Sequence, residues 1–117
     1  MDGTGIKKGL LVIVANDNFA VKNPELVKIF LKVYQRSSEF IKANPQEAAE
    51  LIADEVKLAP DQLVKVLAKF DFEPGIRADD IAELKVSEEF MRTAGIIKTR
   101  VDIDSFIDNR YARDVGF

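Results

Sequence analysis

Two short segments combine residue types that could bind a charged ligand. The first is glycine-rich, with Gly3, Gly5 and Gly9 around Lys8, and a loop of this kind could hold a phosphate group. Phosphate-binding loops follow a strand and open a helix, whereas this segment precedes an expected strand. Lys8 also occupies the place of the third glycine of a dinucleotide-binding loop. We therefore predict a flexible connection here rather than a phosphate site.

The second segment is acidic and resembles the start of a calcium-binding loop. Asp102, Asp104 and Ser105 stand at suitable spacing, but Phe106 occupies the next ligand position. No glycine follows at the required turn and no glutamate closes the loop. Helix capping is therefore the favoured role of these aspartates.

The composition removes most familiar kinds of catalytic and metal site. The 117 residues include no histidine and no cysteine, which excludes thiolate nucleophiles, histidine bases and the common zinc ligands. Carboxylates are plentiful, but none stands in the apolar surroundings that would raise the pKa of a catalytic acid. We accordingly expect a protein that is not an enzyme, with no catalytic residue, no metal and no cofactor. The net charge of −3 argues against nucleic acid as a partner.

The elements that must position any binding residue begin with one apolar strand. Residues 9–16 form a continuous branched apolar run, which is typical of a strand buried on both faces in an α/β protein. This run is too short to span a membrane. Asp17 is expected to cap a short helical turn that follows.

Helices are predicted for most of the remaining chain. The Asn-Pro pairs at Asn23 and Asn44 predict caps followed by helix starts, and Pro60 marks a third start. Apolar residues at spacings of three and four define one face of each helix, and Gly95 is a stop signal. The expected helices are 24–43, 45–57, 60–70 and 79–94. On the first and last of them the residues expected to face inward include Leu26, Phe30, Val33, Ile81, Leu84, Phe90 and Met91.

A single strand leaves its backbone hydrogen-bonding groups without partners. Thr99–Ile103 is the best second strand in the chain, and it is short and polar. We therefore expect a homodimer in which the Leu10–Ala15 strands of two copies pair.

The sequence from Val14 to Ala20, followed by Asn23–Val27, resembles the C-terminal region of substrate-binding proteins of bacterial ABC importers. The similar subgroup is the one for aliphatic sulfonates, taurine, nitrate and thiamine-precursor pyrimidines. The resemblance continues through 30–34, 44–49 and 70–74, and then 90–91 and 96–98. It covers about residues 10 to 110.

The resemblance implies an α/β fold of the periplasmic-binding-protein-like type II class, with two lobes enclosing a ligand. Residues 1–117 would be a single domain, namely the C-terminal part of one lobe. In this chain the partial lobe is mostly helical with one buried strand. The N-terminal part of such proteins, which supplies most ligand contacts, is absent from the sequence.

By the same resemblance the expected function is solute binding for an ABC importer, without catalysis, in contact with an ABC permease. The small-molecule solute would be held only with the missing N-terminal part. The expected location is the periplasm or cell envelope, and because the chain shows no signal peptide a cytoplasmic location stays open. The alternative is a stand-alone helical interaction domain that acts through homo-oligomerisation.

Three residues are candidates for ligand contact. Asn16 and Asp17 follow the carboxyl end of the expected strand, where open α/β sheets bind ligands. Phe72 lies in a loop before Pro74 and could line a cleft, although anchoring in the core is favoured.

Overall fold

The computed structural model describes residues 10–117, so the glycine-rich segment and Gly9 of the expected strand lie outside the described residues. The described part of the chain is helical and includes no strand. Its elements are α1 (Asp17–Lys22), α2 (Pro24–Ala43), α3 (Pro45–Val56), α4 (Pro60–Leu67), α5 (Ala78–Thr93), α6 (Ile103–Phe106) and α7 (Arg110–Asp114).

Proline sets the start of three helices. Pro24, Pro45 and Pro60 each occupy the first helical position, where a missing N–H removes no intrahelical bond. The ends of α2 and α3 fall within one residue of the predicted ends. The end of α4 lies at Leu67 instead of residue 70, because the last turns tighten: Phe70 N donates to Leu67 O at 3.1 Å.

The two asparagines before these prolines do not cap the helices as predicted. Neither side chain accepts a hydrogen bond from the helix that follows. Instead Asn23 Nδ2 donates to Phe19 O at 3.0 Å, and Asn44 Nδ2 donates to Phe40 O at 3.4 Å. Each amide is therefore a second donor to a carbonyl in the last turn of the preceding helix, which also accepts from the backbone N–H of the same asparagine at 2.8 Å.

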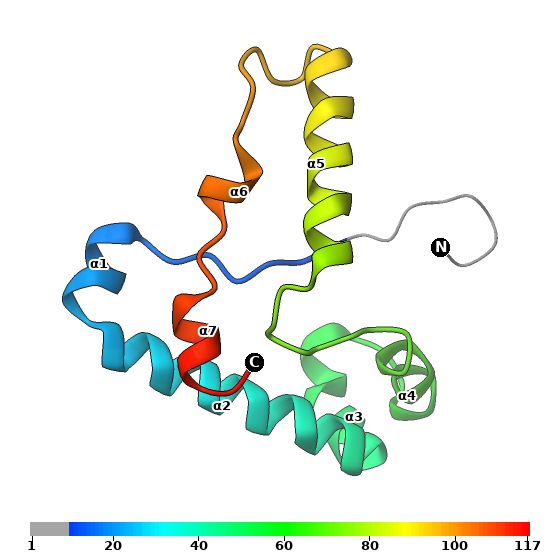
Figure 1. Ribbon diagram of the computed structural model, residues 1–117. Helices are drawn as coiled ribbons and strands as arrows, with labels where there is room; N and C mark the ends of the chain where they lie inside the picture. Colours follow the sequence, from blue (N-terminus) through cyan, green and yellow to red (C-terminus); the bar gives the residue numbers. More distant parts are fainter. Residues whose placement is uncertain (1–9) are drawn as a thin grey trace.

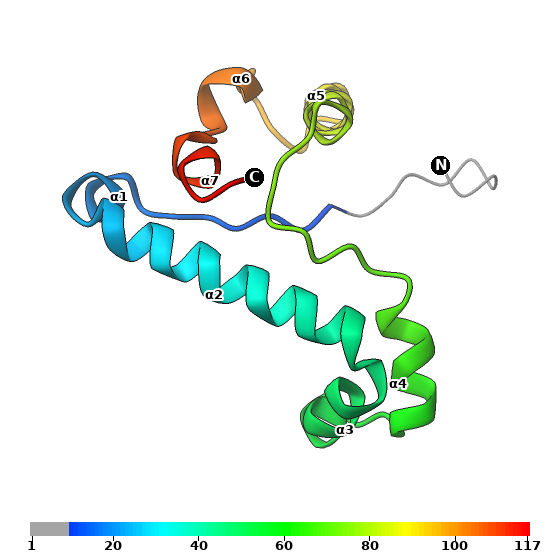
Figure 2. The ribbon, with the colours of Figure 1, turned by 60° about the horizontal axis from the view of Figure 1, so that its bottom comes forward.

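The tightest packing joins α3 to α4. Ala48 and Ala49 on α3 are buried against Leu63 and Leu67 on α4, and Ala49 is fully inaccessible. The small alanine side chains allow the two helices to approach closely at one end of α2 (Figure 2). No large side chain in the described residues is completely buried.

Around α2 the packing is looser. α2 contacts α1, α3 and α7, and Lys28 Nζ joins α2 to α7 through Asp114 Oδ2 at 3.1 Å. Leu26, Phe30 and Val33, which the sequence placed on an inward face, are each more than half exposed. This face of α2 is therefore only partly covered within the described residues.

Helix α5 extends away from the rest and packs against α6 (Figure 1). Gly95 follows α5 with φ +73°, and Ile96 N donates to Met91 O at 2.9 Å, so the predicted stop is confirmed. Phe90, expected to face inward, is 67% exposed. Among the described residues, no helix combines the length and the apolar character needed to cross a membrane.

The prediction of a buried strand over 9–16 is wrong for the part that the structure describes. Residues 10–16 are extended but unpaired, and Leu11 and Val14 are 88% and 75% exposed. The physical reason is that a strand is defined by a hydrogen-bonded partner, and no neighbour is assigned to it within 10–117. The expected α/β architecture is likewise not seen there, whereas the mostly helical character is confirmed.

Candidate functional site

Asn16 lies where the extended apolar segment meets α1. Its side-chain Oδ1 accepts a hydrogen bond from Phe19 N at 3.1 Å, so Asn16 and not Asp17 is the N-cap of α1. The prediction that Asp17 caps this turn is therefore wrong by one residue. An N-cap of this kind uses the amide oxygen and leaves the amide NH₂ as a hydrogen-bond donor.

Asp17 is the first residue of α1 and is exposed. Asn16 and Asp17 thus supply an amide donor and a carboxylate acceptor at consecutive positions at the start of α1.

Phe72 lies far from this pair along the fold. It follows α4, is partly buried and packs against the α3–α4 core, with its ring 5.8 Å from that of Phe70. In Figure 2, α1 and α4 lie at opposite ends of α2, so the structure does not bring Phe72 to Asn16 and Asp17. Its position fits the core anchoring that the sequence favoured.

Hydrogen bonds and ion pairs connect the residues on either side of Phe72. Asp71 accepts hydrogen bonds from Glu73 N at 3.0 Å and from the Arg77 guanidinium at 2.7 Å. These donors lower the pKa of the Asp71 carboxyl below its usual value, with the Glu73 N–H as the larger cause. Lys42 at the end of α2 also pairs with Glu73.

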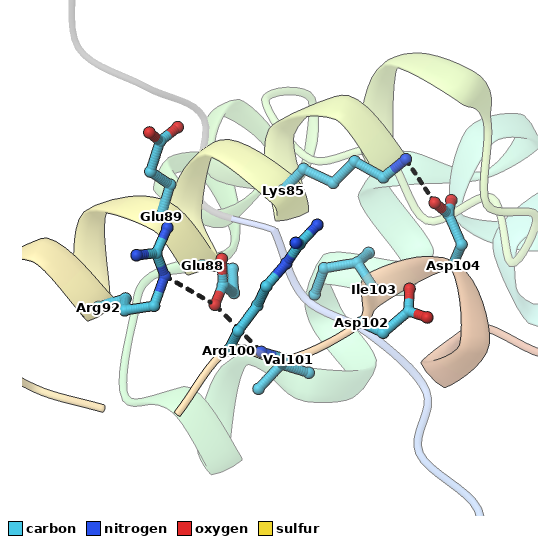
Figure 3. A pocket seen from close by; sticks show the side chains of 9 residues that line it. All are labelled: Lys85, Glu88, Glu89, Arg92, Arg100, Val101, Asp102, Ile103 and Asp104. Carbon is cyan, nitrogen blue, oxygen red and sulfur yellow. Dashed lines mark hydrogen bonds and ion pairs between the residues drawn. The ribbon is translucent and has the colours of Figure 1, made fainter. Parts of the chain in front are cut away.

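A charged hollow of about 490 Å³ lies between α5 and the segment leading to α6 (Figure 3). Glu88 is its best-buried member, with a side chain 9% exposed. Its Oε1 accepts from Val101 N at 3.1 Å and pairs with Arg92 Nε at 3.5 Å. Glu88 therefore fastens the chain after α5 to the helix, with Lys85 and Asp104 forming a second link at 2.7 Å.

The charges of this hollow do not favour a small anion. Its lining includes three cations, Lys85, Arg92 and Arg100, and four carboxylates, those of Glu88, Glu89, Asp102 and Asp104. In Figure 3 Arg100 extends toward Lys85 over Ile103. Because acids outnumber bases and the two linking pairs already engage Lys85 and Arg92, an arriving phosphate would meet net repulsion.

Sequence reasoning did not identify Glu88 as a structural residue. A usable signal existed, because Glu88 continues the spacing of Ile81, Leu84 and Met91 along the inner face of α5. A lone carboxylate on such a face needs a donor, and the backbone N–H of Val101 is that donor here.

A second, apolar groove of about 530 Å³ lies between α2 and α3. Val33, Phe40, Ile41, Leu51 and Ile52 supply most of its wall, with Arg36 as a charged member. Within residues 10–117 no cluster of three or more histidine, cysteine or carboxylate side chains could hold a metal ion.

Comparison with known proteins gives a match over the first part of the chain. The family described as "NMT1/THI5 like" matches residues 6–48. This range includes the extended apolar segment, Asn16, Asp17, α1, α2 and the first turn of α3. The match supports a relationship to that family over this stretch. It does not distinguish an ABC-importer subtype.

One curated relative is the 4-amino-5-hydroxymethyl-2-methylpyrimidine phosphate synthase of Candida albicans, which is 42% identical over 38 residues. The matched stretch is 32% of this chain and 11% of the relative, so it spans about a tenth of the relative's length. No solved structure gives a significant match.

The comparison corrects one expectation drawn from the sequence. The protein was expected not to be an enzyme and to act without catalysis, whereas this relative is named as a synthase. Absence of histidine and cysteine within 117 residues limits the chemistry of these residues alone. That absence carries no information about the catalytic residues of a longer protein that contains a related stretch, such as the synthase.

Proposed function

We propose that this chain contributes to the binding of an aminopyrimidine in a protein of the NMT1/THI5-like kind. The observation that carries the proposal is the 42% identity to a synthase whose name specifies such a pyrimidine. The related stretch of the chain, residues 6–48 by the family match, contains Asn16 and Asp17.

The chemistry of Asn16 and Asp17 suits this ligand class. An aminopyrimidine presents an exocyclic amine beside a ring nitrogen, that is, a donor next to an acceptor. The Asp17 carboxylate can accept from the amine, and the Asn16 NH₂ can donate to the ring nitrogen while its oxygen caps α1. Phe72 has no part in this proposal, because it packs on the α3–α4 core.

Within this proposal we place the protein closer to pyrimidine synthesis than to import. The importer role, its permease partner and its cell-envelope location rest on the sequence resemblance. The synthase assignment has in addition a relative that carries that name. Sulfonates and nitrate, which lack the donor–acceptor edge, are not proposed as ligands.

A titration followed by NMR tests the proposal on the 117-residue chain. Millimolar 4-amino-5-hydroxymethyl-2-methylpyrimidine phosphate should shift the amide signals of residues 16–19, while taurine and nitrate should not. We expect only millimolar affinity, because small-molecule sites enclose most of the ligand surface and Asn16 and Asp17 are exposed. Equal shifts with all three compounds, or none, would contradict the proposal.

The variant Asn16→Asp separates ligand contact from helix capping. Aspartate is as good an N-cap as asparagine, so α1 should persist, but the NH₂ donor is lost. The shifts caused by the pyrimidine should decrease several-fold. Asn18→Ala, on the same helix two residues later, is the matched control and should leave them unchanged.

A further inference from the structure

The extended apolar segment Leu10–Val14 is largely exposed. Four consecutive residues, from Leu11 to Val14, are between 41% and 88% exposed. Figures 1 and 2 show this segment as an extended blue trace without a strand beside it. Such a segment exposes backbone donors and acceptors together with apolar side chains, which is the combination that recruits another strand.

The chain exposes more surface than a compact monomer of its mass. It exposes 9191 Å², while a compact monomer of its mass exposes about 6,400 Å². The nine residues outside the described part contribute at most about 1,400 Å², even if fully extended. The remaining excess of roughly 1,400 Å² exceeds the ~800 Å² that each partner hides in a standard interface.

The other strand candidate in the chain cannot serve as that partner. Thr99–Ile103 is held against α5, because Val101 N donates to the buried Glu88 carboxylate and Asp104 is joined to Lys85. Its donor at position 101 is therefore already engaged. No other segment of the described residues matches Leu10–Val14 in apolar character. A second copy of the chain would supply an identical segment as the partner strand.

We propose that two copies of this chain pair their Leu10–Val14 segments as antiparallel strands about a two-fold axis at Val12. This axis sets Leu10 opposite Val14 and Leu11 opposite Ile13, so that every side chain meets an apolar one. An axis at Ile13 would instead set Leu10 against the polar Asn16. Two short strands hide less than the excess area, and the exposed Leu26, Phe30 and Val33 of α2 are available to add to the interface.

Cysteine cross-linking tests both the partner and the register, because the chain has no native cysteine. Opposite residues in an antiparallel pair lie about 4.5–5.5 Å apart between Cα atoms, which a disulfide can bridge. Val12→Cys, a small change in volume, should give mostly disulfide-linked dimer in a glutathione buffer. A mixture of Leu10→Cys and Val14→Cys should link to each other more than either links to itself.

Leu51→Cys is the matched control, since Leu51 is apolar and 68% exposed but lies on α3 beside the apolar groove. It should form at least tenfold less linked dimer than Val12→Cys. Light scattering on the unmodified chain should give twice 13.1 kDa. A monodisperse monomer, heterogeneous aggregates, or linkage at Leu51 in preference to Val12 would each overturn the proposal.

Discussion

At the scale of single residues, buried polar groups are more informative than exposed charges. Glu88 is almost inaccessible and yet its carboxylate has two partners, the Val101 N–H and the Arg92 guanidinium. By contrast, ion pairs such as Arg110 with Asp108 lie at the surface, where solvent and salt weaken them. The Glu88 contacts fix the path of the chain after α5, whereas a surface ion pair adds little to the stability of the fold.

Removing the Glu88 carboxylate should loosen the segment that it holds. We expect Glu88→Ala to cost about 1–2 kcal/mol, because Val101 N loses its acceptor. The amide of Val101 should then exchange with solvent roughly tenfold faster. Glu89→Ala, an exposed neighbour on α5, should change stability by less than about 0.5 kcal/mol. Equal effects of the two variants would show that Glu88 does not fasten this segment.

The hydrogen bonds to Asp71 predict how its loop responds to acid. The Glu73 N–H and the Arg77 guanidinium lower the pKa of Asp71 in the folded protein. A lowered folded pKa means that the unfolded chain takes up the proton first as pH falls. The contribution of Asp71 to stability is therefore present above its unfolded pKa of about 3.9 and is lost as pH falls through the lower folded value.

A carboxyl-carbon NMR titration measures this pKa directly. Arg77→Gln should raise the pKa of Asp71 toward its usual value and reduce the loss of stability as pH falls below about 4. Glu73 N still donates in this variant, so part of the lowering should remain. An unchanged pKa of Asp71 would contradict a role for the guanidinium.

At the scale of elements, the sequence predicts those features that are set by residues close together in the chain, such as helix starts. The starts of α2, α3 and α4 follow from proline, which acts through its own ring and its own missing N–H. The two Asn-Pro caps were misassigned because an asparagine amide can accept from the next helix or donate to the previous one. The predicted strand is absent over residues 10–16 because strand pairing depends on distant residues. The sequence prediction also placed the N-cap of α1 at Asp17, one residue after the actual cap, Asn16.

Apolar spacing predicts a helix face but does not say whether anything covers it. Leu63 on α4 is 3% exposed, whereas Leu51 on α3 is 68% exposed. We expect Leu63→Ala to cost about 2–5 kcal/mol, because it leaves a cavity against the alanines of α3. Leu51→Ala should cost much less in the 117-residue chain, and urea unfolding compares the two. Equal losses would show that Leu51 is covered in solution.

At the scale of the whole molecule, the described chain is more open than its length requires. Its Cα radius of gyration is 16.8 Å, whereas a compact domain of 117 residues has about 13 Å. α5 contacts little besides α6, and α2 carries exposed Leu26, Phe30 and Val33. If the proposed pairing of two chains forms, folding and association occur together and stability depends on protein concentration.

Concentration dependence therefore gives the last prediction. If the native state is a pair of chains, a tenfold rise in protein concentration shifts the unfolding equilibrium by about 1.4 kcal/mol. With a urea dependence of roughly 2–3 kcal/mol per molar for both chains, the urea midpoint should rise by about 0.5 M.

Val12→Lys sets two like charges against each other at the proposed axis and should abolish the concentration dependence, by dissociating or unfolding the pair. Leu51→Lys, which adds the same charge on α3, should preserve it. A midpoint that stays constant over a hundredfold range of concentration for the unmodified chain would mean that one chain folds alone, with Leu11 and Val14 exposed as the structure has them.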